Sequence, residues 1–153
     1  FHCLLNSNIS RSNPYRGCMH ACAYCYARPS HQFLDFGAGT DFDRKIVVKR
    51  AAASLLRDAF MKSSWKGELI LFSGNTDCYQ PLEATHQITR SLLKVCAEYR
   101  NPVGIITKAP LIERDMDLFG RTRSRYKSTR AVDSILSPKR IGHRKRCHRV
   151  PME

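Results

Sequence analysis

Three cysteines within eight positions are the feature that most limits what this 153-residue chain can become. The segment RGCMHACAYCYARP, residues 16–29, carries Cys18, Cys22 and Cys25. Disulfides use thiols in pairs and a closed structural zinc site needs four ligands. Three neighbouring thiols fit neither arrangement unless something else completes the site.

Two kinds of metal site remain open on spacing alone. In a [4Fe-4S] cluster each cysteine binds a different iron, and the fourth iron is left for a substrate or cofactor. Gly17, just before the first cysteine, permits close backbone approach to such a cluster. In a Cys3His zinc site, His20 or His31 supplies the fourth ligand. The sequence has no second CxxC pair, which favours the cluster over zinc; incidental thiols are the third interpretation.

Short apolar runs alternate with helical stripes from residue 45 to residue 119. The runs in 67–77 and 101–110 predict buried strands, and the stripes in 45–62, 83–99 and 110–119 predict helices. This alternation is typical of βα units with a parallel sheet, whose strands end at one common edge. Polar residues follow both strands and the cysteines follow a possible strand near Tyr15, so we expect functional loops at that edge.

The formal net charge of +13 is concentrated after Phe119, where Lys and Arg far outnumber Asp and Glu. Residues 120–153 show no strand-like run, so we expect a basic, disordered tail. Such a tail suits a nucleic-acid-binding arm or an aberrant end of the coding sequence. No secretory signal or membrane-spanning run is evident, which predicts a cytoplasmic protein with reduced thiols.

The string CMHACAYC resembles the CxxxCxxC signature of the radical S-adenosylmethionine (SAM) superfamily, including the aromatic Tyr24 before the last cysteine. The longer string NPYRGCMHACAYCYARP, followed by TDCYQPLE and GIITK, is similar to a branch related to spore photoproduct lyase, whose members are mostly uncharacterised. The match runs from about Asn13 to Phe119.

This resemblance implies a partial (β/α)6 barrel, about half of it present, with the cluster loop after the first strand. It divides the chain into an N-terminal lead-in (1–12), the N-terminal half of a radical SAM core (13–119) and the basic tail (120–153). We therefore expect the chain to be an N-terminal fragment of the core domain, and its turnover to be in doubt.

The resemblance also implies a chemistry. Cys18, Cys22 and Cys25 would bind three irons, and SAM would chelate the fourth. Reduction by a one-electron donor such as a flavodoxin or ferredoxin would cleave SAM and release a radical that abstracts hydrogen from a substrate. The substrate is open, and kinship with a DNA-repair lyase makes nucleic acid a candidate. The alternatives are a zinc-stabilised nucleic-acid-binding module and an inactive fragment.

Residues outside the cysteine motif receive roles from the same resemblance. Tyr24 would lie beside the adenine or the cluster, and Lys108 would pair with the methionyl carboxylate. Cys78 is a candidate catalytic thiol. The methionyl ammonium would meet the acceptor-rich loop after the first predicted strand, formed by Ser73, Gly74, Asn75, Thr76 and Asp77. A solvated lysine and a turn or helix-cap aspartate are the ordinary structural alternatives for Lys108 and Asp77.

Overall fold

A three-stranded parallel sheet forms the centre of the computed structural model, which describes residues 9–72 and 74–120. Its strands, in spatial order, are β1 (Ile9–Ser12), β4 (Leu69–Phe72) and β5 (Val103–Ile105). A short antiparallel ladder joins β2 (Tyr15–Arg16) to β3 (Val47–Val48) beside it. The prediction of a mixed α/β fold with a parallel sheet is confirmed.

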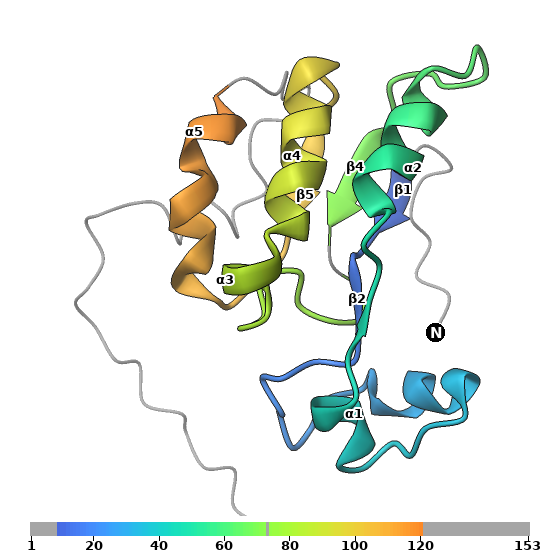
Figure 1. Cartoon of the computed structure of the whole chain (residues 1–153), viewed down its shortest axis with the longest axis vertical. Coiled ribbons are helices and arrows are strands. Elements are labelled where there is room, and N and C mark those ends of the chain that lie inside the picture. Colours follow the sequence, from blue (N-terminus) through green and yellow to red (C-terminus); the bar gives the residue numbers. More distant parts are fainter. Residues whose placement is uncertain (1–8, 73, 121–153) are drawn as a thin grey trace, which may run out of the picture.

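Three helices cover one face of the sheet. Figure 1 shows α2 (Ala52–Phe60), α4 (Ile88–Glu98) and α5 (Met116–Phe119) side by side in front of the strands. Leu92 and Leu93 of α4 are fully buried and share one core with Ile70 and Phe72 of β4. Burial of this apolar stripe, rather than helix propensity, holds α4 in place.

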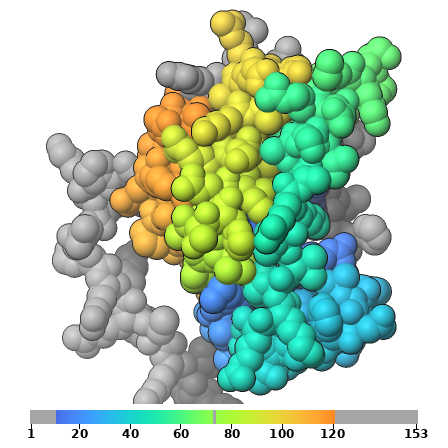
Figure 2. Space-filling view, viewed as in Figure 1, coloured from blue at the N-terminus to red at the C-terminus, as the bar shows by residue number. Residues whose placement is uncertain are grey.

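The cysteine loop belongs to a second, smaller lobe at the carboxyl end of the strands. This lobe contains η1 (Arg28–Leu34) and α1 (Asp41–Arg44), and Figures 1 and 2 show it at one end of the molecule, beyond the helices. Its core consists of Cys18, Ala27 and Phe42, with Cys25 packed against them. The loop thus follows β2, which lies where the sequence indicated a possible strand near Tyr15.

The predicted helix over 45–62 is wrong in its first part. Val47 and Val48 pair with Arg16 and Tyr15 as β3, and helix α2 begins only at Ala52. Two adjacent β-branched residues favour an extended backbone, and the ladder with β2 supplies hydrogen bonds that a helix would have supplied otherwise.

The predicted helix over 83–99 is two helices, α3 (Glu83–His86) and α4, separated by Gln87 at φ 49°. The carboxylate of Glu83 explains the break, because it accepts hydrogen bonds from the backbone amides of Thr89 (3.0 Å) and Arg90 (3.1 Å). These amides lie in the first turn of α4 and have no partner within the helix. A continuous helix could not bring Glu83 back onto them.

The prediction over 110–119 is confirmed only in part. A 3-10 helix, η2 (Pro110–Asp115), precedes the single turn of α5. The lead-in before Ile9, the position of Ser73 and the basic tail after Gly120 lie outside the described residues, so the expected tail disorder stays a prediction. Within the described ranges, no helix is long and apolar enough to cross a bilayer.

Candidate metal-cluster site

The cysteine loop is a series of tight turns between β2 and η1. The amide of Ala21 donates to the carbonyl of Cys18 (3.2 Å), and the amide of Cys25 donates to that of Cys22 (3.2 Å). All three cysteines are free thiols; Cys18 is buried, and the other two are half-buried. Burial raises the pKa of the Cys18 thiol, so an uncompensated thiolate there is disfavoured and a cationic partner would be needed to hold it.

Gly17 fixes how the loop begins. Its φ of 82° lies in the left-handed region, and a Cβ at this position would lie 2.8 Å from both the Ile46 Cδ1 and the Phe42 carbonyl oxygen. The next amide, that of Cys18, donates to the same Phe42 oxygen at 2.9 Å. Only glycine combines this dihedral angle with this close approach to α1.

Gln80 holds the loop against the segment that follows β4. This side chain is fully buried, donates through Nε2 to the carbonyl of Gly17 (3.2 Å) and accepts through Oε1 from the amide of Met19 (2.9 Å). Asn13 and Thr76 add a second attachment. Asn13 donates to the Thr76 carbonyl (2.6 Å), and the Thr76 hydroxyl donates to the Tyr15 carbonyl (2.9 Å).

Lys108 meets the cysteine loop from the end of β5. Its ammonium donates a hydrogen bond to the sulfur of Cys22, and this contact raises the pKa of Lys108. Its backbone amide donates to Asp77 at 3.1 Å, while the Thr107 hydroxyl donates to the same carboxylate at 2.6 Å. The expected meeting of the strand-end loops at one edge is therefore present for Cys22, Asp77 and Lys108.

The residues predicted to receive the methionyl ammonium divide into two groups. Asp77 accepts from Thr107, Lys108 and the amide of Tyr79, and its Oδ2 lies 3.4 Å from His20 Nε2. Thr76 is buried in the attachment described above. Gly74 is half-buried and Asn75 is exposed, so these two remain accessible. Ser73 lies outside the described residues. An ammonium role for this loop stays a prediction.

The aromatic and thiol predictions also have distinct outcomes. Tyr24 precedes Cys25 with 92% of its surface exposed, so a place beside adenine or a cluster stays a prediction. The neighbouring Tyr26, also exposed, donates its hydroxyl to the Gly74 carbonyl. Cys78 lies in the main core with 0% exposed, and burial raises its pKa well above the ordinary value. A catalytic role for Cys78 stays a prediction, and access of a substrate to its thiol would require this part of the core to open.

The described residues hold no assembled site for a single metal ion. In residues 9–72 and 74–120, no three His, Cys, Asp or Glu side chains converge as the ligands of one metal ion must. Nε2 of His31 donates to the Lys45 carbonyl (3.0 Å), so this nitrogen is already occupied. A [4Fe-4S] cluster needs its three thiolates around one cube, each on a different iron. Three free thiols on one short loop are compatible with such a cluster.

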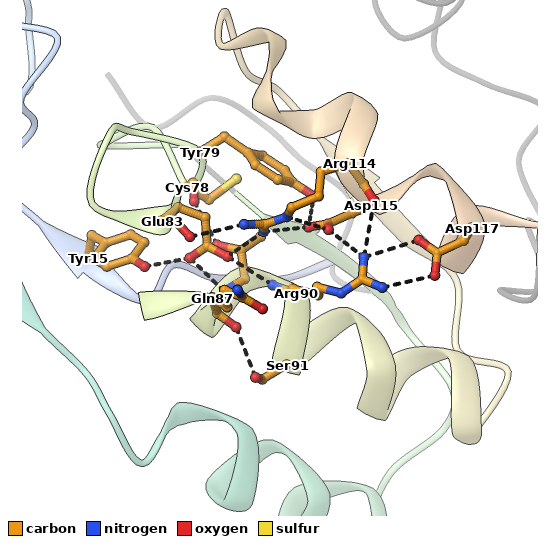
Figure 3. A network of polar contacts seen from close by, with 11 residues as sticks. Tyr15, Cys78, Tyr79, Glu83, Gln87, Arg90, Ser91, Arg114, Asp115 and Asp117 are labelled. Atoms are coloured by element: carbon orange, nitrogen blue, oxygen red, sulfur yellow. Dashed lines mark hydrogen bonds and ion pairs between the residues drawn. The ribbon is translucent and has the colours of Figure 1, made fainter. Parts of the chain in front are cut away.

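A buried polar network beneath the loop escaped prediction from sequence (Figure 3). Tyr15 donates its hydroxyl to Glu83, which is fully buried and accepts from Arg114 at 3.1 Å. Arg114 also contacts the buried Asp115 at 2.8 Å, and Arg90 contacts it at 2.6 Å. Polar residues in a proline-containing loop are usually exposed to solvent. The segment QPLE, residues 80–83, therefore gave no sign that Gln80 and Glu83 are buried.

Comparison with known proteins shows sequence relatives without a stated activity. The uncharacterized proteins Mb2609c of Mycobacterium bovis and Rv2578c of Mycobacterium tuberculosis are each 40% identical over 120 residues, which cover 78% of this chain and 35% of theirs. The uncharacterized protein MJ0683 of Methanocaldococcus jannaschii is 35% identical over 112 residues, covering 73% of this chain and 40% of its own.

No family model matches the chain, and no solved structure matches it. The chain spans about a third of the length of the mycobacterial relatives. The similarity is therefore a similarity of sequence to uncharacterized proteins from a bacterial genus and an archaeon. Any activity of the whole protein is a proposal.

Proposed function

We propose that this chain is the cluster-binding part of a radical SAM enzyme similar to the spore photoproduct lyase group. One observation carries the proposal: three free thiols in one short loop lie at the carboxyl edge of a parallel sheet, where ligands of such folds gather. The odd ligand count suits a [4Fe-4S] cluster with one open iron. When bound, the cluster would supply the electron that cleaves SAM and begins radical chemistry.

The chain's own residues hold and orient the site. Cys18, Cys22 and Cys25 would each bind one iron, and Lys108 would place a positive charge beside the Cys22 sulfur. Gln80 fixes the first turn of the loop, because it satisfies the Gly17 carbonyl and the Met19 amide at once. The exposed position of Lys108 also leaves it able to pair with the methionyl carboxylate of SAM.

We infer further that the sheet is about half of a (β/α)6 barrel. Three parallel strands with helices on one face are what half of a (β/α)6 barrel contains. Ile70 and Phe72 face the helices, whereas Leu69 and Leu71 are half-buried and outside that core. This second apolar face suits the interior of a barrel. The electron donor would be a small one-electron carrier such as a flavodoxin or ferredoxin.

Metal analysis of matched cysteine variants tests the proposal. After anaerobic reconstitution, Cys18→Ala, Cys22→Ala and Cys25→Ala should each lose most of the bound iron and sulfide. Cys96→Ala is the control, because Cys96 is a buried core residue of α4 far along the chain from the motif. Equal iron content in all four variants, or one zinc per chain without iron, would overturn the proposal.

A further inference from the structure

A cavity of about 420 Å³ lies beside the cysteine loop. It opens between the end of β1, the β2 ladder and the turn after β4, and it borders Gly17. Arg11, Arg16 and Lys49 line it, each from a different segment of the chain. No Asp or Glu is found among its described lining residues. The three cations therefore face a common space with no carboxylate in its wall.

The cations are held near one another by the fold. A Cβ placed on Gly74 would lie 4.0 Å from Cδ of Arg11, so this side chain lies along the Gly74 turn. The Lys49 ammonium is anchored by the Asn13 carbonyl at 2.9 Å. Lys49 and Arg16 line the same cavity, and partial desolvation and then the charge of Arg16 lower the pKa of Lys49.

Like charges gathered without an acidic partner repel, and an anion that enters the space relieves that repulsion. Two arginines and a lysine suit a compact oxyanion, because guanidinium groups donate in pairs to phosphate oxygens. Phe33 adds an apolar element: it lines the same cavity with 85% of its surface exposed. An exposed aromatic face beside a cationic wall suits a ring attached to a phosphate.

We propose that this cavity binds the phosphate group of an organic phosphate ester, with its ring on Phe33. The proposal rests on the proposed function in one respect, that the bound ester is the substrate. Binding itself uses Arg11, Arg16 and Lys49 and needs no cluster. The ester could be a free nucleotide or one unit of a nucleic-acid strand, since both present the same phosphate and ring.

Calorimetric titration of the iron-free full chain tests the binding step. The probes are cytidine 5′-monophosphate, cytidine without phosphate, and an eight-residue oligocytidylate at fixed ionic strength. Arg16→Gln combined with Lys49→Gln should weaken the monophosphate at least about tenfold, the loss expected for charge-assisted contacts. Lys62→Gln combined with Lys94→Gln removes the same charge from exposed sites elsewhere, retains the basic tail and should change affinity less than about twofold.

The oligocytidylate separates the two sources. If the oligomer binds much more tightly than the monophosphate, and the Arg16→Gln and Lys49→Gln double variant loses this gain, the ligand is a nucleic-acid strand. If the oligomer binds no more tightly than the monophosphate, the ligand is a free nucleotide. Amide chemical shifts of Gly17, Gly74 and Asn75 in the unmodified chain should move with the monophosphate, which gives a readout independent of any variant.

Equal weakening in both double variants, or cytidine binding as well as its phosphate, would overturn the phosphate site. Neither result would touch iron binding, which is measured separately. Conversely, if the chain bound the phosphate but no iron, the cavity would still be a phosphate site. The bound ester could then no longer be called the substrate of a radical SAM enzyme.

Discussion

The ammonium of Lys108 donates a hydrogen bond to the sulfur of Cys22, although 86 residues separate them in the sequence. The contact joins the turn after β5 to the cysteine loop after β2. A cation at a sulfur ligand is one of the ways in which a protein tunes an iron–sulfur cluster, because it offsets negative charge.

Replacement of this lysine should change the redox behaviour of the site more than its iron content. Lys108→Met is expected to retain iron and to shift the cluster's midpoint potential to a more negative value, since the reduced state carries the additional negative charge. Redox titration followed by electron paramagnetic resonance measures the shift. Lys62→Met is the control: Lys62 is exposed and lies just after α2, so its loss should leave the potential unchanged. An unaltered potential in Lys108→Met would mean that the contact has no electrostatic role.

Gly17→Ala should damage the loop. The left-handed φ of 82° and the 2.8 Å approach of a Cβ to Ile46 and Phe42 together predict a loss of about 2 kcal/mol or more in the free energy of unfolding. Gly39→Ala is the matched control, because a Cβ there meets nothing within 4 Å and the backbone φ is ordinary. Urea unfolding of both variants measures the difference, and equal stability would show that Gly17 is not a constraint.

Gln80→Leu should also loosen the loop. It leaves the Gly17 carbonyl and the Met19 amide without their partner, at about 1–3 kcal/mol for a buried unpaired group. The exposed Gln32, changed to Leu, is the control. We expect Gln80→Leu to unfold at lower urea and to retain less iron after gel filtration. If its iron content and midpoint match those of the Gln32 variant, Gln80 does not hold the loop.

Asp115 should contribute far more to the free energy of unfolding than its neighbour Asp117. Asp115 is fully buried and contacts both Arg114 and Arg90, whereas the carboxylate of Asp117 is exposed and contacts Arg90 alone. Asp115→Asn breaks a buried ion pair and should cost about 3–5 kcal/mol. Asp117→Asn should have a much smaller effect. Thermal and urea unfolding compare the two directly.

The same carboxylate predicts the acid limb of stability. Burial alone would raise the pKa of Asp115, but hydrogen bonds from Arg114 and Arg90 outweigh it and hold the pKa below its ordinary value. Its contribution is therefore complete above the unfolded-state pKa of about 4 and is lost as the pH falls through the lower folded-state pKa. The unfolding free energy of Asp115→Asn should fall less steeply below about pH 4 than that of the parent chain. Identical acid limbs would contradict this assignment.

The sequence predicted the parts of the fold that depend on local pattern. The strands at Leu69–Phe72 and Val103–Ile105 stand out because each is a short apolar run followed by polar residues. The alternation of strand and helix then implies a parallel sheet with its loops at one edge. That topology places Lys108 and the cysteine loop at the same edge, but the contact between the Lys108 ammonium and the Cys22 sulfur is seen only in the structure.

What the sequence could not predict depends on partners distant along the chain. Val47 and Val48 form a strand because they pair with Arg16 and Tyr15 in an antiparallel ladder. Neither dipeptide shows from its own sequence that it has this partner. Gln80 is buried because it satisfies backbone groups 61 and 63 residues away. Tertiary hydrogen bonds of this kind override the usual exposure of polar residues, and no periodicity records them.

The response of the anaerobically reconstituted chain to SAM decides whether the cysteine loop holds a cluster with an open iron. We expect about four irons and sulfides per chain and a changed electron paramagnetic resonance spectrum of the reduced cluster when SAM is added, because one iron has no cysteine ligand. If the chain takes up no iron, or if its cluster spectrum is the same with and without SAM, the loop does not hold such a cluster.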